Sequence, residues 1–176
     1  MSTITLKELS LVSGYSVSTV SKALNNKSDI SKNTREVIKT IANKYNYIPN
    51  TSAVALRKKK TKAISVIIPQ VNTSFYSCFL FNIEKIAYSR GYRVILFQSL
   101  QDASREKEFI NSSNDGSVDG IIIISCSTEL NIASEGKNIL PVEYVKINDI
   151  ISEAQLKKES IMHFSNLLRR ITKFKS

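Results

Sequence analysis

The sequence predicts a chain in two parts: a basic, all-helical head followed by a parallel α/β lobe. The 176 residues carry a net charge of +10, and residues 1 to 62 supply +9 of it, with 12 Lys or Arg against 3 Asp or Glu. Capping residues and apolar periodicity indicate three short helices before residue 49. From residue 61 onward, short apolar runs alternate with helical patterns, which is typical of a parallel sheet with crossover helices.

The first helix has clear start and stop signals. Thr5 and Glu8 have the spacing of a capping box, in which each residue bonds the backbone of the other. Apolar residues then recur at helical intervals through Leu9 to Val12, which predicts a buried face. Gly14 ends the helix, because glycine readily takes the left-handed turn that follows a helix.

Two more helices follow at short intervals. Ser16 is placed to cap the second, in which Val20 and Leu24 point to the core. Ser31 is placed to cap the third, and Pro49 ends it, because the residue before proline avoids the helical region. Its predicted apolar stripe consists of Val37, Ile38, Ile41, Ala42 and Tyr45.

The second helix is unusually rich in hydroxyl groups. Residues 16 to 22 read SVSTVSK, although serine and threonine compete for backbone hydrogen bonds in a helix interior. A generic helical hairpin would not explain these hydroxyls or the +9 charge. We therefore expect this helix–turn–helix at residues 6 to 24 to bind a polyanion, with DNA favoured and an anionic membrane surface the second candidate.

The lobe is predicted from apolar runs of strand length. Residues 63–69, 92–97 and 118–125 read as buried strands, and residues 75–90 and 102–114 read as helices between them. A fourth strand is possible at residues 138–145, where a proline precedes an alternating run.

Several classes of protein are disfavoured. The start lacks the pattern of a secretory signal and no apolar run is long enough to cross a bilayer, so we expect a cytoplasmic protein without a membrane partner. Cys78 and Cys126 have no metal-ligand or CxxC spacing and are read as buried free thiols.

Catalysis is not expected either. His163 is the only histidine, and no phosphate loop, metal cluster or nucleophile–base pair is visible, so no cofactor and no metal are predicted. Asp102, Asp115 and Asp119 are read as helix caps or strand ends.

The head motifs closely resemble those of the lactose/galactose repressor (LacI-type) family of bacterial transcription regulators. The resemblance rests on residues 5–25, on SKNTRE at 31–36 and on YIPN at 47–50, and it extends to about residue 125. It implies a helix-turn-helix head at 1–49, a hinge helix and basic linker at 50–60, and an incomplete periplasmic-binding-protein-like α/β lobe at 61–150. Residues 151–176 would form a basic amphipathic tail.

The resemblance also implies roles for individual residues. Val17, Ser18 and Lys22 occupy base-reading positions in the major groove, with Val17 against a thymine methyl and Lys22 donating to guanine. Hydroxyl and amide side chains elsewhere in the head would bond phosphates and set the register. These phosphate contacts are Thr5, Ser16, Thr19, Ser21, Asn25 and Thr34.

The hinge is expected to act in the minor groove. It is too short to be a stable helix alone, and in the family it folds on DNA beside its dimer mate. Leu56 matches the leucine that is wedged between base steps, which kinks the duplex. Asn50, Ala53, Val54 and Arg57 lie along the same element.

Effector binding is doubtful. The family's cleft lies between two lobes, and only the first can be read in this sequence. Its ligand-facing positions would be Phe75, Tyr76, Asp102 and Ser125, although Thr73 and Ser74 replace the family's usual Asn-Pro nearby. The alternative is that these are ordinary loop and core residues.

The tail from residue 151 carries a net charge of +4 and an apolar face at helical spacing. It could pack on the exposed sheet, mediate dimerisation, lie on a membrane surface, or be sequence acquired when a longer reading frame was disrupted.

The sequence thus predicts a homodimeric repressor that binds a palindromic operator in double-stranded DNA. The alternative is a non-switching DNA-binding remnant or an oligomerisation protein.

Overall fold

The computed structural model describes residues 4–50, 60–125, 140–146 and 152–174. Within it the chain divides into two compact units, Met1–Val54 and Ala55–Ser176. Each unit has its own hydrophobic core, so the head and the lobe are described separately.

The head is a bundle of three helices, α1 (Leu6–Ser13), α2 (Val17–Leu24) and α3 (Lys32–Lys44). Between α1 and α2, Gly14 has φ 71°, a left-handed conformation that costs glycine little and other residues more. The core contains one to two buried side chains from each helix, and partly buried residues surround them. The buried residues are Leu9, Val20, Ala23, Ile38 and Ala42.

Three residues predicted to lie on apolar helix faces are instead exposed. Val12 in α1 is 47% exposed, and Val37 and Tyr45 at α3 also face solvent. The helical period was right, but each helix of this small bundle buries only a narrow stripe against its two neighbours. In α1 that stripe is centred on Leu9.

The lobe contains a four-stranded parallel sheet with α5 (Ser74–Ser89) and α6 (Ala103–Ser112) as crossover helices. The strand order is β2-β1-β3-β4, so the central strands β1 and β3 are flanked by β2 and β4 at the edges. All three pairings are parallel, which confirms the predicted α/β class. The strands are β1 (Ala63–Ile68), β2 (Arg93–Gln98), β3 (Ile121–Ile124) and β4 (Val142–Val145).

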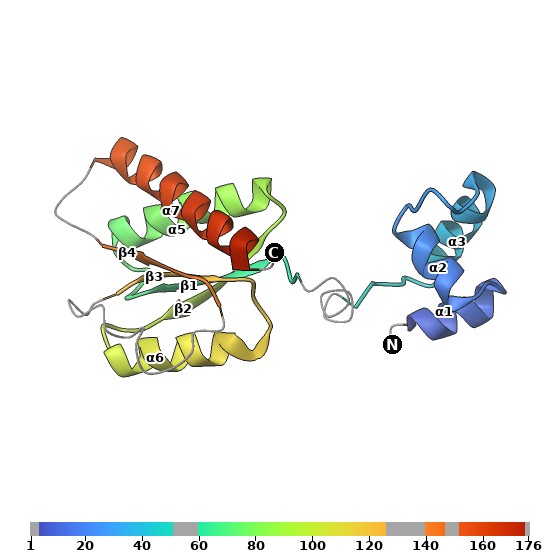
Figure 1. Cartoon of the computed structure of the whole chain (residues 1–176), viewed down its shortest axis with the longest axis horizontal. Coiled ribbons are helices and arrows are strands. Elements are labelled where there is room, and N and C mark those ends of the chain that lie inside the picture. Colours follow the sequence, from blue (N-terminus) through green and yellow to red (C-terminus); the bar gives the residue numbers. More distant parts are fainter. Residues whose placement is uncertain (1–3, 51–59, 126–139, 147–151, 175–176) are drawn as a thin grey trace. The chain divides into compact units, whose positions relative to one another are not determined.

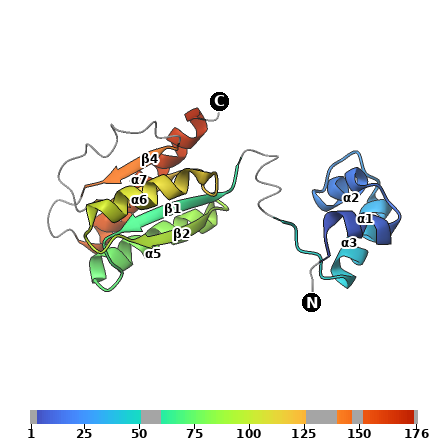
Figure 2. The same cartoon turned by 90° about the horizontal axis from the view of Figure 1, so that it is seen from below.

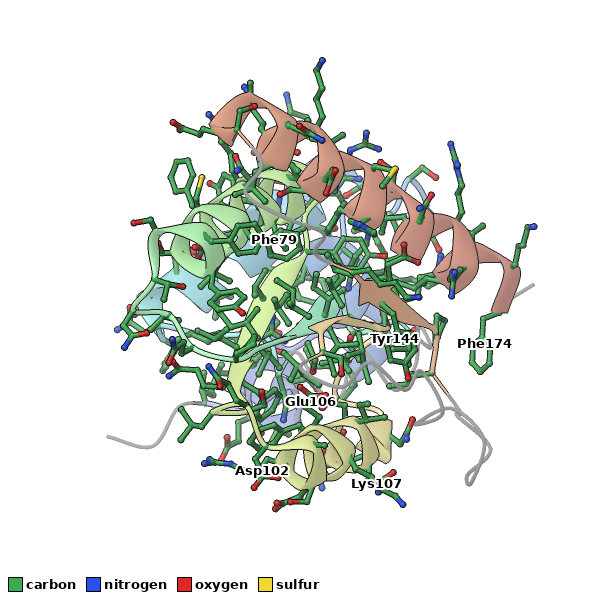
Figure 3. The ribbon with its side chains drawn as sticks, turned by 90° about the vertical axis from the view of Figure 1, so that its left-hand side faces the viewer. Phe79, Asp102, Glu106, Lys107, Tyr144 and Phe174 are labelled. Carbon is green, nitrogen blue, oxygen red and sulfur yellow. The ribbon has the colours of Figure 1, made fainter. Side chains whose placement is uncertain are left out.

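Helices cover both faces of the sheet (Figures 1 and 2). The helices α5 and α7 (Glu153–Phe174) lie on one face, while α6 and the following 3-10 turn η1 (Ser113–Asp115) lie on the other. Phe79 of α5 is buried between its helix and the sheet (Figure 3). Helices on both faces explain why Ile64, Val66 and Ile67 in β1 are all buried.

The basic tail is a helix of the lobe. Along α7, Leu156, Phe164, Leu167 and Ile171 are buried in the same core cluster as β1 and α5. Of the four alternatives left open by the sequence, packing on the sheet is therefore the one that the structure shows. The exposed side of α7 carries its charged residues.

A buried carboxylate joins α7 to the edge strand β4. Glu143 accepts a hydrogen bond from Asn166 at 3.2 Å, and its Oε1 lies 2.9 Å from Nδ1 of His163. Arg170 lies 3.2 Å from the other carboxylate oxygen and also donates to the carbonyl of Val142. A buried carboxylate needs several hydrogen-bond and ion-pair partners, because burying it without them costs free energy.

Asp119 marks the point where the chain enters the lobe. Its side chain is buried and accepts hydrogen bonds from the backbone N–H groups of Thr61 and Lys62, at 2.8 and 3.1 Å. Asp102 caps α6, and Asp115 accepts a bond from the N–H of Ser117. The predicted structural roles of all three aspartates are confirmed.

The prediction of buried thiols is only partly met. Cys78 packs against the lobe core but is only partly buried. Cys126 lies outside the described residues.

Candidate nucleic-acid interface

The helices of the head all begin with a hydroxyl cap. At α1, the backbone N–H of Thr5 donates to Oε2 of Glu8 at 2.7 Å, its hydroxyl donates to the same oxygen at 2.9 Å, and the N–H of Glu8 donates back to the hydroxyl at 3.2 Å. These bonds hold the pKa of Glu8 below its ordinary value. The predicted capping box is confirmed, and the Thr5 hydroxyl proton is engaged within it.

The other two caps have one geometry. At α2, Ser16 Oγ accepts from the N–H of Thr19 at 3.1 Å and lies 2.9 Å from its hydroxyl. At α3, Ser31 Oγ accepts from the N–H of Thr34 at 3.1 Å and donates to its hydroxyl at 2.8 Å. At α3 the Thr34 hydroxyl acts as acceptor, so its own proton remains available to a phosphate oxygen.

The two sides of α2 differ sharply. Val20 and Ala23 are fully buried in the head core, as predicted for Val20. Val17, Ser18 and Lys22 are exposed, so all three predicted base-reading residues lie on the solvent side of one helix. An exposed valine beside an exposed hydroxyl and an ammonium gives this side both an apolar contact and hydrogen-bond donors.

Lys22 has a partner that the sequence did not reveal. Its Nζ lies 2.5 Å from Oδ2 of Asp29, in the loop between α2 and α3. The hydrogen bond from Lys22 holds the pKa of Asp29 below its ordinary value. The one feature of the sequence that hints at this pair is charge, because Asp29 is the only acidic residue between Glu8 and Glu36.

The remaining predicted head residues lie at the C-terminal end of α2 and beyond. Asn25 donates from Nδ2 to the carbonyl of Ser21 at 2.8 Å, which ends the helix. Asn50 is exposed. The other predicted hinge residues, Ala53, Val54, Leu56 and Arg57, lie outside the described residues.

The predicted ligand positions of the lobe have structural partners. Phe75 and Tyr76 pack against the lobe core with ring centroids 5.3 Å apart in a T-shaped contact. Asp102 accepts from the N–H of Ser104 at the start of α6, and its pKa is lowered, mainly by the Ser104 hydroxyl. Core and cap residues make such contacts too, and a ligand role for these positions stays a prediction.

Ser125 belongs to a buried polar group at the carboxyl ends of the strands. Its hydroxyl donates to Glu106 of α6 at 2.6 Å, and Ser99 donates to the other carboxylate oxygen. In Figure 3, Glu106 points from α6 toward the sheet, while Asp102 and Lys107 lie on the outer side of that helix. Burial, and the charge of Glu106, raise the pKa of Tyr144.

Among residues 4–50, 60–125, 140–146 and 152–174, no group of three or more His, Cys, Asp or Glu side chains is arranged to hold a metal ion. Within the same residues, no helix has the length and apolarity that crossing a membrane requires.

Comparison with known proteins identifies the head. Residues 5–50 match the family model described as bacterial regulatory proteins of the lacI family. Catabolite control protein A of Staphylococcus xylosus is 30% identical over 174 residues, which cover 97% of this chain and 51% of that protein. The HTH-type transcriptional regulator DegA of Bacillus subtilis is 28% identical over 162 residues, covering 83% of this chain and 48% of DegA.

A solved structure shows the same architecture. The lac repressor dimer bound to operator and the anti-inducer ONPF is 26% identical, with a TM-score of 0.65 over 70% of this chain and 38% of that one. This chain spans about half the length of the curated relatives it matches.

Proposed function

We propose that this chain, which belongs to the lacI family of bacterial regulatory proteins, is a sequence-specific DNA-binding transcription regulator that acts as a repressor. The observation that carries the proposal is the exposed side of α2. It presents Val17, Ser18 and Lys22 together, and the head with its linker, residues 1 to 62, holds 12 basic and 3 acidic residues. The operator named in the lac repressor structure supports DNA as the partner.

The proposed reading takes place in the major groove. The second helix of a helix-turn-helix inserts there, with its N-terminal side chains against base edges. Val17 contacts a thymine methyl, Ser18 bonds a base edge, and Lys22 donates to the acceptors of guanine. Val20 and Ala23 fix the orientation of the helix, because both are locked into the head core.

Phosphate contacts set the register of the head on the duplex. The Thr34 hydroxyl and the Asn25 side chain suit this role, since each keeps polar capacity beyond its internal bond. Thr5, Ser16 and Thr19 lie at capped helix N-termini, where the partial positive charge of the helix also attracts an anion. The full proposed set is Thr5, Ser16, Thr19, Ser21, Asn25 and Thr34.

The hinge completes the proposal in the minor groove. Leu56 inserts between base steps, and Asn50, Ala53, Val54 and Arg57 contact the groove around it. The support is the resemblance of residues 50–57 to the family's hinge helix, which follows directly on the match to the family model at residues 5–50.

A palindromic operator requires two heads, so we propose that the chain works as a homodimer in the cytoplasm. The outer side of α5 suits self-association, because Phe81 is 62% exposed and Tyr88, two turns later on the same side, is 86% exposed. Large apolar side chains gathered in this way are typical of an interface. The proposal includes no effector.

Selection of bound duplexes from a random DNA pool at near-physiological salt tests this function. We expect an inverted repeat with a flexible central step. Lys22→Ala should relax the preference at one position of each half-site, and Leu56→Ala should weaken binding and reduce bending. Lys158→Ala, which removes an exposed charge from α7, is the matched control. Selection of no motif, or full operator affinity and specificity in both variants, would refute the proposal.

A further inference from the structure

The loop between α2 and α3 is held in place from α3. Arg35 donates from Nη2 to the carbonyls of Lys27 and Ile30, at 2.8 and 3.1 Å. One turn further along α3, Lys39 donates to Oδ1 of Asn26 at 2.6 Å. Both sides of the loop are therefore anchored to the same helix, and the residues between the anchors have a fixed position relative to α2.

Asp29 lies between these anchors, next to Lys22. The carboxylate and the ammonium are 2.5 Å apart, and each side chain is about half exposed. Such a pair adds little to stability in water. The pair instead changes the hydrogen-bonding capacity of Lys22. An ammonium has three N–H donors, and the bond to Asp29 uses one of them. The pair also places a negative charge within contact distance of the only cation among the three proposed base-reading residues.

This arrangement changes what Lys22 contributes to DNA binding. A lone lysine on a flexible stem is attracted to any phosphate, and such attraction is independent of sequence. The Asp29 carboxylate cancels much of that attraction. It also restricts the lysine side chain, so the remaining donors meet a base edge without the full loss of rotamer freedom that a mobile lysine would suffer.

We propose that Asp29 is a specificity-determining residue of the head, which positions Lys22 for guanine and suppresses its attraction to phosphate. The proposal rests on the proposed role of Lys22 in base reading. Asp29 lowers affinity for non-operator DNA more than it lowers affinity for the operator, so it raises the preference for the operator.

The test compares the full chain with Asp29→Asn on two duplexes, the operator recovered by selection and a shuffled duplex of the same composition. Fluorescence anisotropy between 50 and 200 mM salt gives both affinities. Removal of one opposing charge should raise shuffled-duplex affinity several-fold. The slope of log affinity against log salt concentration should become steeper by about 0.9. Operator affinity should rise less, so that the ratio of operator affinity to shuffled-duplex affinity drops by up to several-fold.

Two variants separate the possible outcomes. Glu36→Gln removes an exposed acidic charge from α3, and it should raise both affinities alike and leave their ratio unchanged. In a Lys22→Met background, Asp29→Asn should also leave the ratio unchanged, because the residue it positions is gone. Thermal unfolding checks that each variant remains folded.

An unchanged or higher ratio in Asp29→Asn, together with a reduced ratio in Lys22→Met, would overturn the role of Asp29 and keep Lys22 as a base reader. An unchanged ratio in Lys22→Met would overturn both. A drop in the ratio for Glu36→Gln equal to that for Asp29→Asn would also overturn the proposal, because net charge alone would then explain it.

Discussion

Phe164→Ala tests whether α7 is part of the lobe core. The side chain is 1% exposed and lies in the cluster that also contains buried residues of β1, β3 and α5. Its ring meets that of Tyr92 edge-on, with centroids 6.2 Å apart. Truncation of a buried phenylalanine costs about 3–5 kcal/mol, and the lost aromatic contact is one component of that cost. Because a domain is stabilised by only ~5–15 kcal/mol, this loss removes a large fraction of the lobe's stability.

Urea denaturation followed by far-UV circular dichroism measures this effect, with amide exchange by NMR to separate the lobe from the head. We expect the lobe transition to shift to lower urea while the head transition stays in place. Phe174→Ala is the matched control, since it removes the same group from the same helix at a position that is 53% exposed. It should change stability by less than about 0.5 kcal/mol.

A loss below about 1 kcal/mol for Phe164→Ala would refute the reasoning, because α7 would then contribute little to the lobe core. A shift of the head transition by the same amount would also contradict it, since Phe164 packs only within the lobe cluster in the described structure.

Three further predictions concern other parts of the chain. Thr5→Ala should lower the stability of the head by about 1 kcal/mol in thermal unfolding, because it removes the α1 cap. Gly120→Ala should destabilise the lobe by about 1–3 kcal/mol, because the new Cβ would lie 2.9 Å from Cδ1 of Leu167. In an NMR titration the Asp29 carboxyl should show a pKa below its ordinary value, and Lys22→Met should raise it. Since folding lowers this pKa, the pair's stabilisation is present above the unfolded pKa and disappears as pH falls through the folded one.

The order and type of the elements could be predicted because local signals agreed with the fold. The Thr5 capping box, the apolar run from Ala63 and the turn at Gly14 each depend on neighbours within a few residues. The predicted strand boundaries differ most at two starts: β4 begins at Val142 rather than residue 138, and β3 begins at Ile121 rather than residue 118. Residues Val118 to Gly120 are buried for another reason: this segment meets the entry of the chain into the lobe.

Contacts between distant residues could not be predicted in the same way. Nothing local to Asp29 indicates that Lys22, seven residues earlier in the sequence, lies within contact distance of it. The partners of Glu143 come from a helix that starts ten residues later. Such pairs depend on how helices and loops pack, which periodicity and capping rules do not specify.

The position of α7 has a consequence for synthesis of the protein. The ribosome delivers a chain from its N-terminus, and the head is complete once residue 50 has emerged, so it is free to fold early. The lobe cannot do so. Its first strand begins at Ala63, yet the core cluster that contains Ile64 and Val66 also contains Phe164 and Leu167, about a hundred residues later. Until these residues emerge, an apolar sheet face stays exposed to chaperones and to neighbouring nascent chains, and the lobe's folding rate is limited by these non-local contacts.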